Sequence, residues 1–536
     1  MQLKIGKLAI ILLSFSLIAH ANAQSISVED MVTYTKQSGY IREFDVPIDK
    51  LGLKGVTNDN NGNVWFYHST NITSAIFRFD SRTESFTQYA IEGETIVDVP
   101  IINLAGGQLA FDKLRNVIWF TDARVNSIGK MYLDEEKIEL VPIPTPRSGP
   151  MGIALSPDEK SVWFAEIIGD KIAKLDVESN KITEYSTGKE TGPTLLTFDD
   201  RGVLWVTSSY SNNVFRVEPG LLDSLIASGI TSFTLPKPDS FSPFGIAVVT
   251  SDGEQKVFLS DHGSSRVIYS DTSLQHYISY WTSPSKIYPT TLPSQIVADK
   301  AGNIYFVQHG GNRISKIDVN SGLMTEYDIP TGPLSTIVYL SVPEDGKRVW
   351  FTEWAANKIG YLDTETSIHF SLEVDKDEIT LPRNTPYELD ALVTAQGQSS
   401  TISLSSLGFA IIGMTDDGLR GITYNVNPQW LDMTNNSQTT SKITLEADST
   451  AQGGKHTIMV RVSALEKDDL VVSKLFPLSI NLDQTNTQMG GQNIISKEKE
   501  PLSVDDITKL LAMAVAAGLL GLLIYNRTKR TKKLEN

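Results

Sequence analysis

Acidic and imidazole side chains stand at matching places in a segment that this chain repeats, and they are its best candidates for chemistry. Each copy contains an apolar aromatic run, VWFAE in the clearest case, and the runs end at His68, Asp122, Glu166, Ser208, Asp261, Gln308 and Glu353. Carboxylate oxygens and imidazole nitrogens bind divalent cations. Glu353, Glu166, Asp122 and Asp261 are therefore candidate metal ligands, with His309 beside them, and Mg or Ca is the cofactor that they suggest. The competing interpretation is that these acids cap backbone amides of the following loop.

Catalysis would need a base, and the candidates at or beside these positions are His68, His309 and Glu353. An imidazole suits this task because its pKa lies near neutral pH. His262 and His309 each precede a glycine, however. For both, a loop histidine without a chemical role is the alternative.

The repeated segment is a unit of β-strands. In the copy KSVWFAEIIGDKIAKLDVES, an aromatic run is followed by a short polar loop and a second strand, and further strands lie on either side. The aromatic anchors lie roughly 40 to 55 residues apart, in the range of propeller blades: Trp65, Trp119, Trp163, Trp205, Phe258, Tyr305 and Trp350. Four strands in each of the seven repeats predict a seven-bladed β-propeller, with these aromatic side chains packed between blades.

Two rings of residues would face the mouth of such a propeller. In an antiparallel blade the second strand ends on the face where the first strand begins. The first-strand starts are Lys54, Gly106, Met151, Thr194, Phe244, Ser294 and Leu334. Residues Tyr40 to Ile48 resemble the closing strand of a repeat but precede the first copy. We expect this strand to pair with the last blade and close the ring.

The chain changes character after the repeats. Alternating strands such as HTIMVRVSA predict an immunoglobulin-like β-sandwich. An apolar segment near the C-terminus is long enough to cross a bilayer. The predicted fold class is all-β with a single C-terminal transmembrane helix, in this order: signal peptide 1–23, propeller 24–374, sandwich 375–483, flexible stalk 484–506, transmembrane helix 507–525 and basic cytoplasmic tail 526–536.

The two ends predict a single-pass protein of the cell membrane with its N-terminal ectodomain outside. Lys4, Lys7, an apolar core and an Ala-Asn-Ala site ending at Ala23 form a secretion signal. Basic residues after the apolar segment keep the C-terminal tail in the cytoplasm. Asn71 and Asn435 lie in Asn-x-Ser/Thr sequons, so both would be glycosylated in a host with that machinery.

Composition limits the partners. The chain carries 47 Lys and Arg against 63 Asp and Glu, a formal net charge of −16, and part of its basic charge lies in the tail. An acidic ectodomain argues against nucleic acid as a partner, because nucleic acid requires a basic face. The sequence has no cysteine, which excludes disulfides, thiolate metal sites and a cysteine nucleophile.

The repeats resemble the streptogramin lyases over roughly Tyr40 to Asp363, most closely in WFTEWAANKIGYLD from Trp350 and in GPMGIAL from Gly149. The resemblance implies a seven-bladed propeller. It also implies an enzyme that opens cyclic depsipeptide antibiotics by elimination, using Mg²⁺, glutamates and histidines.

The residues that would carry this activity are only partly present. In the family the histidines stand in Pro-His-Gly-Ile or Pro-His-Ala-Ile at the first-strand starts of late blades. Here the equivalent tripeptides begin at Pro243, Pro293 and Pro333, and none contains histidine. Glu353 and, by repeat symmetry, Glu166 match the family's site in type.

Two hypotheses follow for the function. The first is a surface binding module that recognises an extracellular small molecule, a glycan or another protein, because the base of the resembled lyases is missing. The second is a divergent metal-dependent lyase or lactone hydrolase that uses the acidic ring with His68 or His309. We favour binding, since a fold does not carry its activity without the site.

Overall fold

The computed structural model describes residues 32–35, 38–70, 72–95, 106–222, 229–235, 242–285, 290–333, 335–396, 407–412, 421–434, 436–465 and 470–482. The chain divides into two compact units, 1–484 and 485–536, and every described residue belongs to the first. Within the described ranges, no helix is both long and apolar enough to cross a membrane. The predicted signal peptide, stalk, transmembrane helix and basic tail lie outside those ranges.

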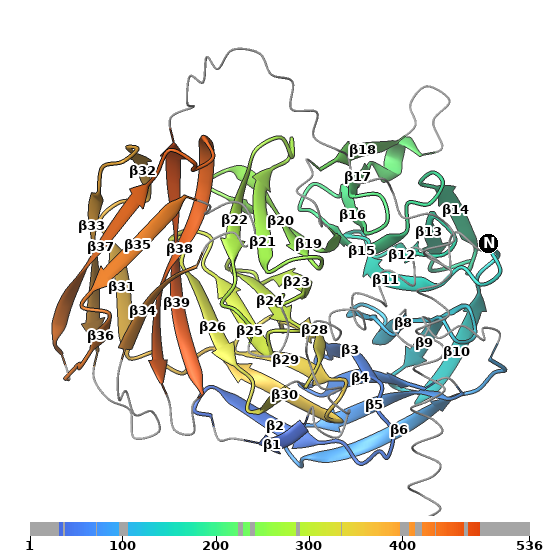
Figure 1. Ribbon diagram of the computed structural model, residues 1–536. Coiled ribbons are helices and arrows are strands. Elements are labelled where there is room, and N and C mark those ends of the chain that lie inside the picture. Colours follow the sequence, from blue (N-terminus) through green and yellow to red (C-terminus); the bar gives the residue numbers. More distant parts are fainter. Residues whose placement is uncertain are drawn as a thin grey trace, which may run out of the picture. The chain divides into compact units, whose positions relative to one another are not determined.

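The described chain is all-β, and most of its strands form four-stranded antiparallel sheets (Figure 1). We name each sheet by its first strand. The β3 sheet has β3 Leu53–Asn58, β4 Val64–Ser69, β5 Ser74–Asp80 and β6 Ser85–Ile91. The β7 sheet has β7 Leu109–Asp112, β8 Val117–Asp122, β9 Ser127–Tyr132 and β10 Lys137–Pro142. The β11 sheet has β11 Pro150–Leu155, β12 Ser161–Glu166, β13 Lys171–Asp176 and β14 Ile182–Ser186.

The later sheets repeat this order. The β15 sheet has β15 Pro193–Phe198, β16 Leu204–Ser208, β17 Asn213–Val217 and β18 Ile230–Thr234, with a short 3₁₀ helix at Pro219–Leu221. The β19 sheet has β19 Pro243–Ser251, β20 Glu254–Asp261, β21 Arg266–Asp271 and β22 Tyr277–Trp281. The β23 sheet has β23 Pro293–Ala298, β24 Ile304–Gln308, β25 Arg313–Ile317 and β26 Met324–Asp328. The β28 sheet has β28 Ile337–Ser341, β29 Arg348–Glu353, β30 Lys358–Asp363 and, from the N-terminal end of the chain, β2 Ile41–Asp45.

The sheets surround a common centre, as in a propeller. Each first strand contacts the first strand of the next sheet, in the order β3, β7, β11, β15, β19, β23, β28 and back to β3. The anchor aromatics fill the space between sheets, as predicted. Trp163, for example, is 1% exposed and packs against Leu196, Leu204 and Phe215 of the β15 sheet. One sheet cannot bury both its faces alone, so neighbouring sheets stabilise each other.

The predicted closing strand is confirmed. Strand β2 pairs antiparallel with β30, from Ile41 opposite Leu362 to Asp45 opposite Lys358. Phe44 packs on the ring of Phe79 from the next sheet, with 4.7 Å between ring centroids. The outer edge of the β28 sheet is therefore covered by a strand that comes from the other end of the repeats.

The region predicted as a sandwich contains two sheets. One has the order β31-β33-β37-β35, with β31 Phe370–Val374, β33 Tyr387–Ala395, β37 Gln438–Ala447 and β35 Ile422–Asn427. The other contains β39 Val471–Leu482, β38 Gly454–Leu465, β34 Leu407–Ile412 and β36 Trp430–Leu431, and β32 Glu378–Leu381 pairs with β39. Their facing side chains share one buried apolar cluster, in which Leu389 and Ile443 of the first sheet lie with Ile458 and Leu478 of the second.

One connection was not predicted. Strand β26 of the β23 sheet pairs antiparallel with β39, from Met324 opposite Leu475 to Tyr327 opposite Val472. The β23 sheet therefore continues by backbone hydrogen bonds into the sandwich, as Figure 1 shows. The sandwich is joined to the propeller along a strand as well as through the chain.

Candidate functional site

The ring of first-strand positions differs from the prediction in the last sheet. Leu334, expected there, lies outside the described residues, and β28 begins only at Ile337. Ile337 pairs with Glu353, the last residue of β29. In the β11 sheet, Pro150 pairs in the same way with Glu166, the last residue of β12. The ring residue is therefore Val338. The prediction placed the strand too early because a separate short strand, β27 Thr331–Pro333, pairs there with β1 Val32–Thr35.

In the β7 sheet the ring position also differs from the prediction, by one residue. Leu109 pairs with Phe120 as Ile153 pairs with Phe164 in the β11 sheet. The ring residue Met151 lies two residues before Ile153, so the equivalent residue here is Gly107 and not Gly106. The ring defined by register is Lys54, Gly107, Met151, Thr194, Phe244, Ser294 and Val338. None of these residues is a histidine.

Apolar side chains from several sheets meet at this mouth. They form one contact cluster, which we call the mouth cluster: Ala123, Met151, Ile167, Leu195 and Tyr339, with Ile168, Tyr210, Phe244 and Val338 packed against them. Two polar atoms inside it, the hydroxyl oxygens of Tyr210 and Tyr339, are buried and find no hydrogen-bond partner among the described residues. The ring thus has an apolar part around Met151, Phe244 and Val338, and the predicted acids Glu166, Asp261 and Glu353 end the strands that pair with the residues beside the ring positions.

Lys54 is the cation of the ring, and the sequence analysis gave it no role. It is 3% exposed, and its Nζ lies 5.8 Å from the centroid of the Tyr67 ring. Burial lowers the pKa of Lys54 to about 7, against an opposing effect of the Asp122 charge. An amine with this pKa is partly neutral at neutral pH, so it can accept a proton.

The histidines occupy two different settings. His262 and His309 are 6% and 4% exposed, and their rings meet edge to face with centroids 5.8 Å apart. The ring of His262 also lies 5.0 Å from that of Phe244, so both histidines are buried beside the mouth cluster. Burial lowers the pKa of His262 to about 4 and that of His309 to about 3, which leaves both neutral. His68 lies in the β3 sheet, where its Nε2 is 3.0 Å from the Lys50 carbonyl oxygen, and burial lowers its pKa.

Two of the four candidate metal ligands cap loops. Asp122 accepts hydrogen bonds from the Ser74 hydroxyl at 2.7 Å and from the Arg124 backbone amide at 2.9 Å. Asp261 accepts hydrogen bonds from the backbone amides of Ser242 and Gly263 at 2.9 and 3.1 Å. These contacts agree with the capping interpretation for both aspartates.

The two glutamates are different, because each lies near a second, partly buried carboxylate, Glu184 or Glu43. Among the residues that the structure describes, no donor is in good hydrogen-bond geometry with either carboxylate oxygen of Glu166, although the Ser148 hydroxyl lies near enough to lower its pKa slightly. Burial, and next the charge of Glu184, raise the pKa of Glu166 to about 8. Glu184 itself accepts bonds from the Lys171 ammonium at 2.6 Å and the Thr145 hydroxyl at 2.8 Å, and these outweigh its burial and lower its pKa.

Glu353 repeats this arrangement in the β28 sheet. Its side chain is fully buried, and among the described residues no donor is in good hydrogen-bond geometry with its carboxylate oxygens, although the Glu43 carboxyl and the Ser335 hydroxyl lie near enough to act on its pKa. Burial, and next the charge of Glu43, raise its pKa well above the ordinary value. Glu43 accepts bonds from the backbone amide and the hydroxyl of Thr331 at 3.0 and 2.6 Å, but burial raises its pKa as well. Since Glu43 has these donors, Glu353 is the carboxyl of the pair that holds a proton.

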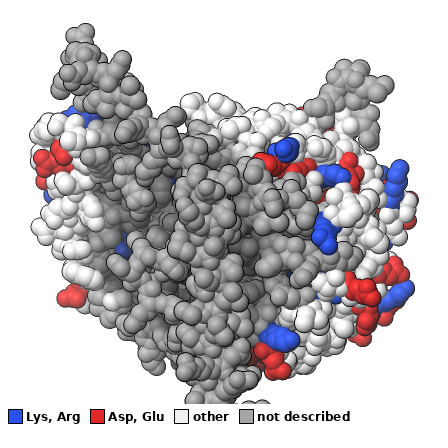
Figure 2. Space-filling model, turned by 45° about the vertical axis from the view of Figure 1, so that its right-hand side comes forward, with Lys and Arg blue, Asp and Glu red and all other residues white. Residues whose placement is uncertain are grey.

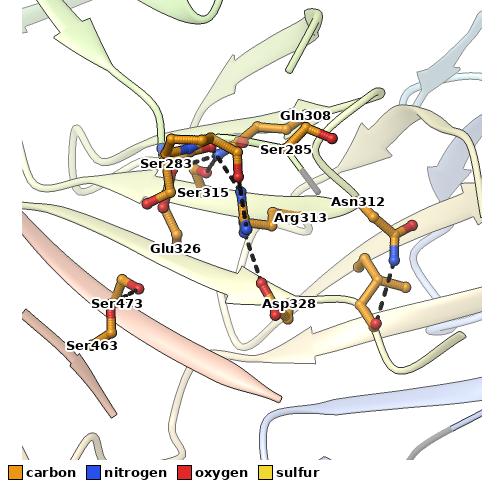
Figure 3. Close-up of polar contacts among 12 residues, drawn as sticks. Ser283, Ser285, Gln308, Asn312, Arg313, Ser315, Glu326, Asp328, Ser463 and Ser473 are labelled. Atoms are coloured by element: carbon orange, nitrogen blue, oxygen red, sulfur yellow. Dashed lines mark hydrogen bonds and ion pairs between the residues drawn. The ribbon is translucent and has the colours of Figure 1, made fainter. Parts of the chain in front are cut away.

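The β23 sheet carries a third copy with glutamine at the second-strand end (Figure 3). The Gln308 amide donates to Glu326 Oε1 at 2.7 Å, and the Ser283 backbone amide donates to the same oxygen at 3.0 Å. Arg313 stands where the other copies have lysine, and its Nε donates to Asp328 at 2.7 Å. In all three sheets the glutamate of the outermost repeat strand accepts a hydrogen bond from a residue that precedes the first strand of that sheet.

The structure does not bring the candidate ligands together. Among the residues it describes, no group of three or more His, Asp or Glu side chains could hold a metal ion. Glu353, Glu166, Asp122 and Asp261 each lie in a different sheet. In Figure 2 the coloured Lys, Arg, Asp and Glu side chains are interspersed and form no single acidic patch. Asn71 and Asn435, the predicted glycosylation acceptors, lie outside the described residues.

Sequence reasoning missed the fourth-strand glutamates, although a signal was present. Glu184 and Glu326 stand in the same Thr-Glu-Tyr tripeptide, and Glu43 stands in Arg-Glu-Phe of the displaced strand. A charged residue that returns at the same place in several repeats could have indicated a shared contact within each sheet. Tyr210 and Tyr339 gave no such signal, because only the ring brings them together.

Comparisons with known proteins agree on the propeller. A model of the virginiamycin B lyase family matches residues 25–262. A structure of streptogramin B lyase is 25% identical, with a TM-score of 0.50, and the match covers 60% of this chain and 97% of that one. A catalytically inactive histidine-to-alanine variant of virginiamycin B lyase from Staphylococcus aureus, solved with quinupristin, is 23% identical over 60% of this chain and 98% of its own, also with a TM-score of 0.50. No curated protein matches the sequence. The family match and these neighbours support the conclusion that the repeats of this chain form a virginiamycin lyase-like β-propeller.

Proposed function

We propose that this chain is a membrane-anchored, extracytoplasmic binding protein whose seven-bladed propeller captures a ligand at its mouth. The anchor is the apolar segment 507–525, and an immunoglobulin-like sandwich links it to the propeller. The ligand is an extracellular small molecule, glycan or protein, and nucleic acid is disfavoured by the negative charge.

The observation that carries this proposal is the ring at the mouth. By register it consists of Lys54, Gly107, Met151, Thr194, Phe244, Ser294 and Val338, and most of its neighbours are apolar. The resembled lyases would place their histidines in this ring. An apolar mouth with a few buried polar groups is typical of a binding site.

A direct test is to incubate the full-length protein with quinupristin and follow the ligand by mass spectrometry. We expect that quinupristin is not converted to a linear product, because none of the seven residues at the propeller mouth is a histidine. Binding is tested by thermal shift of the native protein and of Met151→Arg against a panel of cyclic peptides, glycans and secreted proteins. Ligands that stabilise the native protein but not Met151→Arg support the proposal, and ligands that stabilise both equally contradict a site at the mouth.

The alternative is a metal-dependent lyase or lactonase, and one observation favours it: Glu166 and Glu353 have buried carboxylate oxygens for which the described residues offer no well-placed donor. Carboxylate oxygens of this kind suit Mg²⁺ or Ca²⁺. His68, His309 or Lys54 would then supply the base.

Metal analysis and melting temperatures test this alternative. A cation that binds only the folded state raises the free energy of unfolding by about 2.7 kcal/mol when its concentration is a hundred times its dissociation constant. If the acids bind one, Ca²⁺ or Mg²⁺ will raise the melting temperature of the native protein and will raise that of Glu353→Gln less. Ring opening that disappears in Glu353→Gln would establish the enzyme.

The proposed anchoring is tested by topology. A reporter fused after Asn536 should be cytoplasmic, and glycosylation at Asn71 should report an outside position in a eukaryotic host. Protease cleavage of the tail in intact cells would contradict this orientation.

A further inference from the structure

We propose that the sandwich carries a second binding site, in which Arg461 and Trp430 bind a sugar ring that bears a carboxylate, as in an acidic extracellular glycan. Arg461 lies on β38 and Trp430 lies on β36. Neither residue belongs to the propeller, so the site is separate from the mouth and does not depend on the function proposed for it.

The backbone register places both residues on one face of their sheet. Trp430 pairs with Gly408 of β34, and Gly408 pairs with Ser463 of β38. Paired residues share a face, and so do residues two apart on a strand, such as Arg461 and Ser463. Leu431 belongs to the sandwich core and is 2% exposed, so its neighbour Trp430 points away from that core. Strands about 4.8 Å apart place the α carbons of Trp430 and Arg461 roughly 12 Å from each other, within reach of a ligand between the two long side chains.

Arg461 is a partly buried cation for which the described residues offer no acceptor. Its Nε is enclosed and makes no hydrogen bond with any of them. Burial lowers the pKa of Arg461, and the charges of Glu326 and Asp328 oppose this effect without a direct contact. Glu326 accepts instead from the Gln308 amide, and Asp328 from Arg313. A guanidinium that loses water without gaining an acceptor is costly. Its planar fork fits a carboxylate through two parallel hydrogen bonds.

Arg461 stands at the border between a covered and an open part of this face. Met459, two residues before it, is fully buried and packs with Trp281 of the β19 sheet. In the other direction, β34 has Gly408 and Ala410, two of the smallest residues, at the positions of this face. Beyond β34 comes Trp430, which is 66% exposed. A ligand that lies across β34 can therefore contact both the guanidinium and the indole.

The body of the ligand follows from the surroundings of Trp430. Residues 427–430 are all exposed, and Asn427 and Gln429 add two amide side chains to this segment. An exposed indole packs against the apolar face of a ring. Amide side chains both donate and accept hydrogen bonds, which suits the hydroxyl groups of a sugar. A sugar with a carboxylate matches the indole, the amides and the guanidinium together.

The probe for this proposal is a trisaccharide of galacturonic acid, compared with its methyl ester, which keeps the rings and removes the charge. Binding to the full-length protein is measured by isothermal titration calorimetry. We expect the acid to bind at least about tenfold more tightly than the ester, because a hydrogen bond to an ionised partner is the stronger kind. Inorganic sulfate at the same ionic strength should displace the acid only weakly, since it has no ring to pack on Trp430.

Variants separate the two contacts. Arg461→Gln should weaken binding of the acid about tenfold and leave the ester unchanged, whereas Trp430→Ala should weaken both probes alike. Lys442→Gln is the matched control, because Lys442 is an exposed cation on the other sheet of the sandwich, and it should bind like the native protein. Met151→Arg alters only the mouth and should also bind the acid normally.

The melting temperature without ligand gives an independent result. A partly buried charge without a direct partner does not stabilise the fold, so Arg461→Gln should melt at or above the native temperature. A clear fall in melting temperature would mean that Arg461 serves the fold, for example by holding Glu326 through a bridging water, and would overturn the proposal.

The remaining results decide the ligand class. Equal affinity for the acid and its ester, or unchanged binding by Arg461→Gln, overturns the carboxylate contact. Complete displacement by sulfate, or no effect of Trp430→Ala, overturns the sugar and leaves a site for an anion alone. If the acid does not bind at all, the site on the sandwich is wrong, and the thermal-shift panel with Met151→Arg still decides separately whether the mouth binds a ligand.

Discussion

The β23 and β28 sheets build similar polar networks, in which Gln308 and Arg313 of the first replace Glu353 and Lys358 of the second. In the β23 sheet Gln308 donates its amide to Glu326 at 2.7 Å. In the β28 sheet Glu353 holds the position of Gln308, and Glu43 holds that of Glu326. Burial raises the pKa of both Glu353 and Glu43. The amide of Gln308 can donate a hydrogen bond to Glu326 at any pH. Two carboxyl groups in the same places can form a hydrogen bond only while one of them is protonated.

The two sheets also differ in how they are completed. The β23 sheet is made of consecutive strands and is extended by β39, whereas the β28 sheet takes its outer strand from the other end of the repeats. Phe44 of this strand packs against Phe79 and Trp350. The β28 sheet is therefore the place where the ring opens if a contact fails.

Deleting Tyr40 to Ile48 should have the largest effect. It removes strand β2 with Glu43 and Phe44, and it leaves β30 as an exposed sheet edge. We expect aggregation or a large loss of melting temperature, measured by differential scanning fluorimetry. Deleting 32–35, which pair with the short strand β27, is the control and should cost much less. An unchanged melting temperature after the first deletion would mean that the ring closes without β2.

Glu353→Gln should make the β28 sheet behave like the β23 sheet. The folded-state pKa of Glu353 lies above its ordinary value of 4.5, so the folded protein keeps a proton that the unfolded chain releases. This contribution to stability is complete below pH 4.5 and is lost as the pH rises through the folded-state pKa, at about 1.4 kcal/mol per pH unit. The substitution should flatten that decline in urea unfolding measured at several pH values.

The reciprocal change, Gln308→Glu, sharpens the comparison. It should introduce a decline of stability with rising pH that the native β23 sheet lacks, because Glu326 would then face a second carboxyl. Glu166→Gln is a further control, since the Glu166 pKa of about 8 places its own decline between pH 4.5 and about 8. If Gln308→Glu unfolds with the native pH profile, the two carboxyls do not share a proton.

Glu326→Ala should cost less than the deletion but more than a surface change. It removes the side-chain acceptor of the Ser283 backbone amide and one of the two acceptors of the Gln308 amide, which keeps its bond to the Ser315 hydroxyl. Two lost partners should lower the free energy of unfolding by about 2–4 kcal/mol, measured by urea titration. Glu326→Gln keeps an acceptor oxygen and should cost less. Equal losses for both variants would show that charge and not hydrogen bonding matters there.

The ion pairs at the ends of the two networks should give the smallest effects. Asp328, beside Arg313, is largely buried, whereas Asp45, beside Lys358, is 86% exposed. Asp328→Asn should therefore destabilise the protein clearly more than Asp45→Asn, which should cost less than about 1 kcal/mol. High salt should reduce the Asp45 effect further. Equal effects in thermal melts would contradict the difference in burial.

The sequence pointed to some residues of the candidate site and missed others, for a physical reason. The sequence singled out Glu353 and Glu166 as candidate metal ligands, and that role stays a prediction. It did not find their partners Glu43 and Glu184, since these stand two strands away in the sheet. It also predicted an acidic mouth, but Asp122 and Asp261 turn back to cap their own loops.

The sequence by itself determined the repeated strands, the buried tryptophans and the displaced closing strand, because these depend on a local pattern of apolar and turn-forming residues. Only the tertiary structure decided that Val338 and not Leu334 completes the ring, that β26 joins β39, and that Tyr339 meets Phe244 beside His262. These facts depend on backbone register and on contacts between residues far apart in the chain. Such contacts leave no periodic trace in the sequence, because each is set by how whole sheets pack around a centre.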